Sequence, residues 1–168
     1  MTHETYCGYV ETPLGKALVS AENDAVTGFW FIGQKYFPKN AEQWPVKQDA
    51  PIFATLQEWF DAYFAGKNPP LGFTCAPKGS EFQKAVWDIL LQIPHGKLTT
   101  YGAIAKQMAK RMGRETMSAQ AVGGAVGHNP ISVIIPCHRV VGTNGSLTGY
   151  AGGIDKKTAL LRLEGALL

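Results

Sequence analysis

One segment organises the chain: residues 134–141, which read Ile-Ile-Pro-Cys-His-Arg-Val-Val. Ile134 and Ile135 predict a buried strand, which ends at Pro136 because proline cannot donate a hydrogen bond to a sheet. Cys137 then lies where the backbone leaves the core, in a position that can be shielded and still face a cleft. A thiolate is a strong nucleophile, and His138 beside it is a candidate base. The alternative is that Cys137 is one more small buried apolar residue, the commonest fate of a free cysteine.

The string Pro-Cys-His-Arg-Val at residues 136–140 resembles the active-site signature of the O6-alkylguanine-DNA alkyltransferases, a family of single-turnover DNA repair proteins. The resemblance extends over residues 79–164, and a weaker likeness covers the N-terminal part. It implies an α+β protein with two domains. Residues 1–75 would form an antiparallel sheet with a covering helix (ribonuclease H-like). Residues 79–168 would form a mostly helical, winged-helix-like domain that contains a helix-turn-helix.

The resemblance also implies an activity and a partner. The chain would be a methylated-DNA–protein-cysteine S-methyltransferase that repairs DNA by direct reversal. It would move the alkyl group of O6-alkylguanine, or of O4-alkylthymine, to its own Cys137 and would be used up in one turnover. The partner would be double-stranded DNA, entered from the minor groove with the damaged base flipped out of the stack, since a stacked, paired guanine cannot meet a thiolate in line. No cofactor and no metal is implied.

Composition sets limits on the class of protein. The 168 residues suffice for one large domain or two small ones, and 45% hydrophobic against 17% charged residues indicates a packed core rather than disorder. No apolar run reaches the length of a membrane span, and the first ten residues lack a signal-peptide pattern. Three widely spaced cysteines, an odd number, suit free thiols in a reducing compartment. We therefore expect a cytoplasmic monomer with no membrane partner.

Charge divides unevenly along the chain. Residues 1–79 carry six basic and eight acidic side chains, whereas residues 80–168 carry ten basic and five acidic ones. The half with Cys137 is therefore the basic half, which fits a polyanionic partner there. Five excess positive charges are also compatible with an ordinary solvated surface, so charge alone does not indicate nucleic acid.

The N-terminal half shows strand patterns followed by one helix. Residues 6–10, 16–21 and 25–32 predict an antiparallel meander with turns between them. From Pro51 to Gly66, apolar and aromatic residues recur at helical spacing and predict a helix that seals the sheet. Residues 67–79 are rich in proline and glycine and mark the boundary between the two halves. No candidate reactive group stands out in the N-terminal half.

The C-terminal half begins with a capping box. Ser80 with Gln83 opens a predicted helix that extends to Ile93. Thr99 or Thr100 caps a second helix over residues 101–112, and Ser118 caps a third over residues 119–127. Asp155 is expected to cap a last helix. The second and third helices suggest a helix-turn-helix that reads DNA, although many such pairs serve only packing.

The third helix, residues 119–127, has almost no large side chains. Its three glycines each weaken it by about 1 kcal/mol relative to alanine. A helix with this composition admits a close neighbour, which could be another helix or a DNA backbone. In the resembled family this helix enters the minor groove.

Roles for single residues follow from the resemblance. His138 would act on Cys137 through a water and be held by Glu164, and Asn129 would brace the loop before the cysteine. Tyr101 would donate a hydrogen bond toward the base and help to rotate it outward. The sequence alone favours Glu164 as a surface carboxylate at a helix end. Asn129 is also a candidate helix C-cap, a role compatible with bracing the loop. Arg139 is expected to hold structure through a salt bridge or carbonyl contacts. The pocket and DNA surface would comprise Arg114, Gln120, Ala121, Gly123, Val126, Val140, Tyr150 and Ala151.

Two departures and two rival functions remain. Well-known family members place an arginine where this chain has Gln120, and the arginine fills the gap that the flipped base leaves. Ala151 stands where serine is more common. A Cys-His thiol hydrolase would use the same pair but needs an oxyanion hole. A sequence-specific helix-turn-helix regulator would leave Cys137 structural. The spacing of the cysteines and histidines does not match a zinc site.

Overall fold

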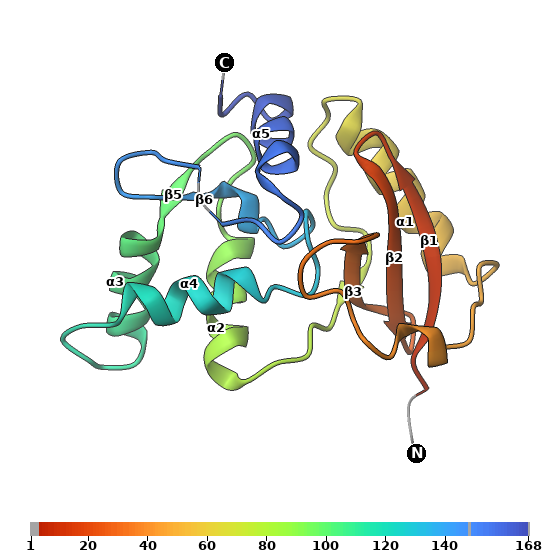
Figure 1. Cartoon of the computed structure of the whole chain (residues 1–168), viewed down its shortest axis with the longest axis horizontal. Helices are drawn as coiled ribbons and strands as arrows, with labels where there is room; N and C mark the ends of the chain where they lie inside the picture. Colours follow the sequence, from red (N-terminus) through yellow and green to blue (C-terminus); the bar gives the residue numbers. More distant parts are fainter. Residues whose placement is uncertain (1–3, 148, 168) are drawn as a thin grey trace. The chain divides into compact units, whose positions relative to one another are not determined.

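The computed structural model describes residues 4–147 and 149–167 (Figure 1). The chain divides into two compact units, Met1–Lys78 and Gly79–Leu168. Among the described residues, no helix is both long enough and apolar enough to cross a bilayer.

The first unit is built on a sheet with the order β1-β2-β3-β4. Strands β1 (Tyr6–Thr12), β2 (Gly15–Glu22) and β3 (Ala25–Phe31) form the predicted antiparallel meander. At the β2–β3 turn, Asn23 and Asp24 both adopt positive φ, 52° and 61°. Two such residues in succession form the type of turn whose twist matches a hairpin. The local turn chemistry therefore sets the register of β2 and β3 next to the turn, as far as the register shift between Ser20 and Ala21.

Strand β4 (Thr74–Cys75) is a correction to the sequence analysis, which assigned this segment to the boundary between the two halves. The strand pairs in parallel with β3, and the backbone N–H of Ala76 donates to Val26 O at 2.7 Å. A two-residue strand is too short to leave a periodic pattern in the sequence. Strand β4 is therefore recognised only from its pairing with β3 at the edge of the sheet.

Helix α1 (Pro51–Phe64) packs against the sheet, as predicted. Its rings enter the core: Phe60 stacks on Phe29 with 4.6 Å between ring centroids. Phe53 lies against Gly8 of β1, where an added Cβ would come within 2.7 Å of the ring. Each fully buried aromatic side chain of this kind contributes about 1.5–3 kcal/mol. The packing of these aromatic side chains contributes to the stability of this unit.

The second unit contains the helices α2 (Glu81–Leu91), α3 (Tyr101–Arg111) and α4 (Ala119–Gly127). All three predicted N-caps are present. Ser80 and Gln83 form the capping box, Thr100 Oγ1 accepts from Ala103 N at 3.0 Å, and Ser118 Oγ accepts from Ala121 N at 3.2 Å. Each cap of this kind contributes about 1 kcal/mol. Helix α4 packs on both α2 and α3.

The remaining elements are short. Strand β5 (Thr99–Thr100) pairs in parallel with β6 (Val140–Val141), and α5 (Ile154–Leu163) follows. The cap of α5 differs from the prediction. Gly153, with φ 101°, is the N-cap, and Asp155 lies in the first turn. The left-handed backbone at Gly153 strongly favours glycine, which explains why the N-cap lies at Gly153, two residues before Asp155.

Residues 131–139 do not form the predicted strand. Ile135 N donates to Ile131 O at 3.0 Å, and a short 3-10 helix, η2 (Cys137–Arg139), follows Pro136. The apolar residues are buried as expected, with Ile131 and Ile135 both fully inaccessible. Their polar backbone groups are satisfied locally and by one side chain, Asn129, instead of by a neighbouring strand. Burial was therefore predicted correctly and backbone conformation was not.

Candidate active site

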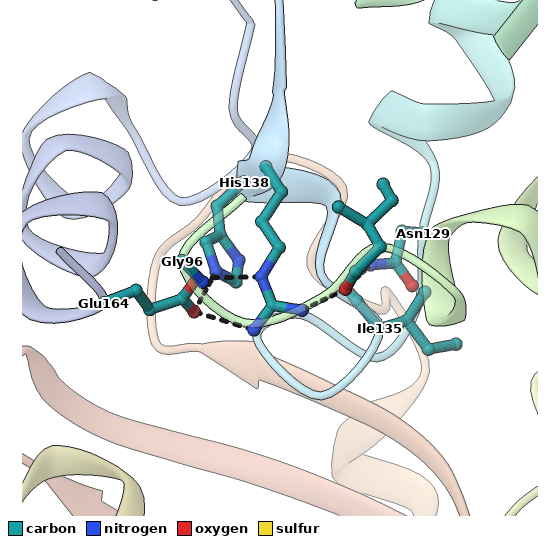
Figure 2. A network of polar contacts seen from close by, with 7 residues as sticks. Gly96, Asn129, Ile135, His138 and Glu164 are labelled. Carbon is teal, nitrogen blue, oxygen red and sulfur yellow. Dashed lines mark hydrogen bonds and ion pairs between the residues drawn. The ribbon is translucent and has the colours of Figure 1, made fainter. Parts of the chain in front are cut away.

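Cys137 is the first residue of η2, and only 6% of it is exposed. Asn129, just after α4, holds the loop that leads to it. Its Nδ2 donates to Ile135 O at 2.8 Å, and its Oδ1 accepts from Ile131 N at 3.0 Å. Figure 2 shows Asn129 beside Ile135. Because both ends of the amide are used, the loop before the cysteine has little freedom to move. The side chain of Asn129 also interacts with the Cys137 thiol.

A buried network that includes His138 and Arg139, the two residues after Cys137, is centred on Glu164 at the end of α5 (Figure 2). Glu164 Oε2 lies 2.7 Å from His138 Nε2. Arg139 donates from Nε to Oε1 at 2.8 Å and from Nη2 to Oε2 at 3.0 Å. The carboxylate side chain is fully buried, so Glu164 is not a surface residue at a helix end.

Arg139 and Gly96 complete the network. Arg139 Nη1 donates to Ile93 O at 2.6 Å, which ties η2 to the turn that follows α2. Gly96 N donates to Glu164 Oε1 at 3.4 Å. Two parallel N–H groups on one carboxylate form the strongest kind of charge-assisted pair. Arg139 thus makes both a salt bridge, to Glu164, and a carbonyl contact, to Ile93, which are the two kinds of contact that the sequence analysis expected.

The network fixes the proton positions on His138. Burial lowers the pKa of His138 below its usual value, opposed by the hydrogen bond and the charge of Glu164. The ring is thus neutral near pH 7. An ionised carboxylate only accepts hydrogen bonds, so Nε2 carries the proton and Nδ1 is left as the acceptor. Nδ1 is buried and makes no hydrogen bond to any part of the chain that the structure describes, Cys137 Sγ included.

Lys157 is a member of the site that sequence reasoning missed. It is completely buried, and its Nζ donates to Val140 O at 2.6 Å. Burial lowers its pKa to about 8, and the negative charge of Cys137 opposes that shift. A signal was present in the sequence: Leu160 and Leu161 follow three and four residues later, which places Lys157 on the apolar face of α5.

Burial raises the pKa of the Cys137 thiol above its usual value. The hydrogen bond from Asn129 and the charge of Lys157 both act in the opposite direction, as does a backbone hydrogen bond. Burial has the larger effect and favours the protonated thiol, whereas these polar neighbours favour the thiolate.

Tyr101, the first residue of α3, lies between α4 and the loop before α5. An added Cβ at Gly123 would be 3.9 Å from the Tyr101 ring, and one at Gly149 would be 3.6 Å from its hydroxyl oxygen. Tyr150 and Ala151, both half-buried, follow directly in that loop. Of the predicted pocket residues, Tyr101 thus lies near the loop that carries Tyr150 and Ala151.

Helix α4 divides into a packed face and an open one. Val122, Ala125 and Val126 are buried, and Trp87 Nε1 donates to Ala125 O at 2.8 Å. Val126, which the sequence analysis counted among the pocket and DNA-surface residues, is only 2% exposed and belongs to the core, so it is not available on the surface of α4. Gln120, Ala121 and Gly124 are exposed, and Arg114 is exposed in the preceding turn. A Cβ at Gly124 or Gly127 would meet no described atom within 4 Å, so packing in the protein does not require glycine there.

The fold and the site together define a protein with a buried cysteine in the same compact unit as three packed helices. Two family descriptions match the chain. Residues 81–166 match the DNA-binding domain of 6-O-methylguanine DNA methyltransferase, and residues 5–76 match the ribonuclease-like domain of the same family.

Known relatives agree with these matches. The chain is 38% identical to a methylated-DNA–protein-cysteine methyltransferase of Methanosarcina acetivorans, over 96% of this chain and 99% of that protein. It is 37% identical to one of Haemophilus influenzae, over 95% and 86% of the two chains.

Solved structures give the same result. The O6-methylguanine methyltransferase of Mycobacterium tuberculosis is 37% identical, with a TM-score of 0.82 and coverage of 96% of this chain and 93% of that one. A structure of Mycobacterium tuberculosis OGT in complex with DNA is 36% identical, with a TM-score of 0.81 and coverage of 96% of this chain and 93% of that one. The chain belongs to the 6-O-methylguanine DNA methyltransferase family.

Proposed function

We propose that this protein repairs O6-alkylguanine in double-stranded DNA by a single, irreversible transfer of the alkyl group to Cys137. One observation carries the proposal. A buried thiol at Cys137 directly precedes in the chain His138 and Arg139, which form a buried network with Glu164, within the unit that matches a DNA-binding domain.

The reaction is a displacement at the alkyl carbon. The Cys137 thiolate forms the new S–C bond, the C–O6 bond breaks, and its electron pair passes to the purine, which takes up a proton. Activation of the nucleophile by a nearby base is the general pattern for such chemistry. His138 Nδ1 is the proposed acceptor of the thiol proton, reached through a water because Nδ1 and Sγ make no direct hydrogen bond. Glu164 holds the ring and stabilises its charged form.

The pocket for the base is proposed to lie around Tyr101, Tyr150, Ala151 and the Val140 carbonyl. Tyr101 is a suitable hydrogen-bond donor toward the purine as charge builds on it, because its hydroxyl lies close to the loop at Gly149. Cys137 is only 6% exposed, so a stacked base cannot reach it. The base must therefore be flipped out of the duplex, at a cost of a few kcal/mol.

The proposed DNA surface is the open face of α4. Gly124 and Gly127 allow a backbone or groove wall to approach closely, and Gln120 and Ala121 are exposed on the same helix. We propose entry from the minor groove, with the Gln120 amide filling the gap beside the orphaned cytosine. Arg114, which is exposed in the turn before α4, is proposed to contact phosphate. Arg111 is less available, because it pairs with Asp88 at 2.7 Å and with the carbonyl of Ala85.

One copy of the chain is proposed to act alone, because every residue assigned to the site lies in Gly79–Leu168 of a single chain. Cys7, Cys75 and Cys137 are free thiols, which suits action in the cytoplasm. The product thioether has no proposed route back to the thiol, so each molecule reacts once.

The test compares the protein with Cys137→Ser on a duplex that carries one O6-methylguanine. The unaltered protein should restore guanine up to one equivalent and then stop. The variant should bind the duplex with similar affinity and restore none, because the open face of α4 and not the thiol supplies binding. Repair beyond one equivalent, or repair by Cys137→Ser, would overturn the proposal. Binding to one preferred sequence without regard to the lesion would instead support a regulator.

A further inference from the structure

Strand β1 lies at one edge of the sheet in the first unit (Figure 1). In an antiparallel pair, the N–H and C=O groups of alternate residues face the neighbouring strand, and those of the residues between them face away. In β1 the groups that face away from β2 belong to Cys7, Tyr9 and Glu11. An edge strand with unpaired backbone groups is a template for pairing with another chain. Here all three residues are bonded to other parts of the same chain.

Main chain closes the first of these positions. Cys7 N donates to Pro45 O at 2.9 Å, and Lys47 N donates to Cys7 O at 2.8 Å, which forms a short parallel bridge. The outward-facing groups of Tyr9 and Glu11, further along β1, are bonded to side chains instead.

Two glutamine amides take the place of a neighbouring strand. Gln48 Oε1 accepts from Tyr9 N at 2.7 Å, and its Nε2 donates to Tyr9 O at 3.0 Å. Gln57, on α1, repeats the pattern: its Oε1 accepts from Glu11 N at 3.0 Å, and its Nε2 donates to Glu11 O at 2.9 Å. A primary amide has an acceptor oxygen and a donor nitrogen, so it can bond both backbone groups of one residue as a partner strand would.

Further contacts support this arrangement. Gln57 Nε2 also donates to Asp61 Oδ1 at 2.9 Å, one turn later on α1, which fixes the orientation of the amide. Strand β3, on the other side of the antiparallel meander, is closed in a similar way near its end. Gln34 Oε1 accepts from Phe31 N at 2.9 Å, and Gln34 N donates to Phe31 O at 3.1 Å. Glutamines therefore cover backbone groups on both sides of the meander.

Stability alone does not require the two amides on β1. Gln48 is exposed and Gln57 is half-buried, so water can reach this edge and could bond to Tyr9 and Glu11 in their place. A hydrogen bond that replaces one to water adds little net stability, and ordering a long glutamine side chain costs conformational entropy. The amides differ from water in one respect: they are tethered to the edge, so a second strand must displace them before it can pair.

We propose that Gln48 and Gln57 keep the β1 edge closed to a second copy of this chain. Once they are removed, two copies can pair their β1 strands antiparallel about Val10, with Tyr9 of each copy opposite Glu11 of the other. This pairing is symmetric, uses the same residues on both copies and places no like charges opposite each other. The inference concerns the first unit and does not depend on alkyl transfer in the second.

The first test needs no variant. Hydrogen exchange of the Tyr9 and Glu11 backbone amides is measured by NMR in the unaltered protein, in a dilute sample. Both amides should exchange at least about tenfold more slowly than in an unstructured chain, because the glutamine oxygens accept from them. Exchange at the unstructured rate would show that the side chains do not close the edge, and would overturn the proposal.

The second test opens the edge with the double variant Gln48→Ala/Gln57→Ala. The matched control is Gln43→Ala/Gln107→Ala, which removes two exposed glutamines away from β1. Sedimentation equilibrium follows self-association from low to high micromolar concentration. The edge variant should associate at least about tenfold more tightly than the control and the unaltered protein. Its Tyr9 and Glu11 amides should exchange faster when dilute and regain protection as the copies associate.

Two results of the second test would overturn the proposal. An edge variant that associates no more tightly than the control shows that the amides exclude nothing. Association that leaves Tyr9 and Glu11 unprotected places the contact elsewhere on the chain. A circular dichroism melt establishes that each sample is folded. If the double variant is unfolded, Gln48→Ala and Gln57→Ala are compared singly, and tighter association by neither has the same meaning.

Discussion

Replacing Gly124 in the middle of α4 should stabilise the protein and weaken its action on DNA. A Cβ at Gly124 meets no described atom within 4 Å, so alanine fits without a clash. Alanine is favoured over glycine in a helix interior by about 0.8–1.0 kcal/mol. Gly124→Ala should therefore raise the melting temperature by about 2–4 °C if the chain unfolds as one unit.

The opposite effect on DNA follows from the proposed close approach. In the proposed complex, a larger side chain at position 124 would hold the DNA minor groove away from α4. It would also weaken the neighbouring contacts between α4 and DNA. Gly124→Leu should weaken binding to a duplex that carries O6-methylguanine by about tenfold, equivalent to about 1.4 kcal/mol. Gly124→Ala should have a smaller effect in the same direction. Reaction with free O6-methylguanine base should not change, because no duplex is involved.

The assay is a fluorescence binding titration beside a thermal melt of the same samples, with the free-base reaction as the internal control. The expected rise in melting temperature and the expected loss of duplex affinity test two separate claims: that the fold does not require Gly124, and that DNA approaches α4 closely there. If Gly124→Leu binds the duplex as tightly as the unaltered protein, the open face of α4 does not contact DNA. If Gly124→Ala lowers the melting temperature, glycine is required by the fold and the argument for close approach fails.

Three further results are expected. Alkylation of Cys137 should destabilise the protein by about 1–3 kcal/mol, because added atoms overpack a buried site; an unchanged melting temperature after complete alkylation would show that the site is roomier than the burial of Cys137 indicates. Gln120→Ala should slow repair of duplex DNA by about fivefold to tenfold, the value of one hydrogen bond of about 1 kcal/mol plus some packing, and should spare the free base; equal slowing of both would assign Gln120 to the fold. Glu164→Gln should lower the free energy of unfolding by about 3–5 kcal/mol, because Arg139 then keeps a buried charge without its partner; a loss below about 1 kcal/mol in urea unfolding would contradict this reading.

Local signals predicted most elements of the fold. Hairpin turns, capping boxes and helical spacing depend on neighbours within about four residues, so the sequence contains all that defines them. Strand β4 was missed because its two residues pair only with a distant strand. The strand expected at Ile134 and Ile135 was wrong because an apolar run specifies burial and not backbone conformation. Asn129 satisfies the loop there and removes the need for a sheet partner.

The site divides in the same way. Cys137 and His138 are adjacent in the sequence, and their chemistry could be inferred directly. Glu164 lies 26 residues from His138, so no local pattern joins them, and only the family resemblance supplied the pair. Lys157 was overlooked because a lysine near a helix start is normally exposed. Its phase relative to Leu160 and Leu161 was the available evidence that it is buried.

The most direct test of the account is to find which cysteine receives the alkyl group. The protein is mixed with an excess of duplex DNA that carries O6-methylguanine, and intact mass and peptide mass spectra are recorded. The account predicts a gain of one methyl group per molecule, located on Cys137, with Cys7 and Cys75 unmodified. Methylation of Cys7 or Cys75, or loss of the lesion with no gain in the mass of the protein, would contradict it.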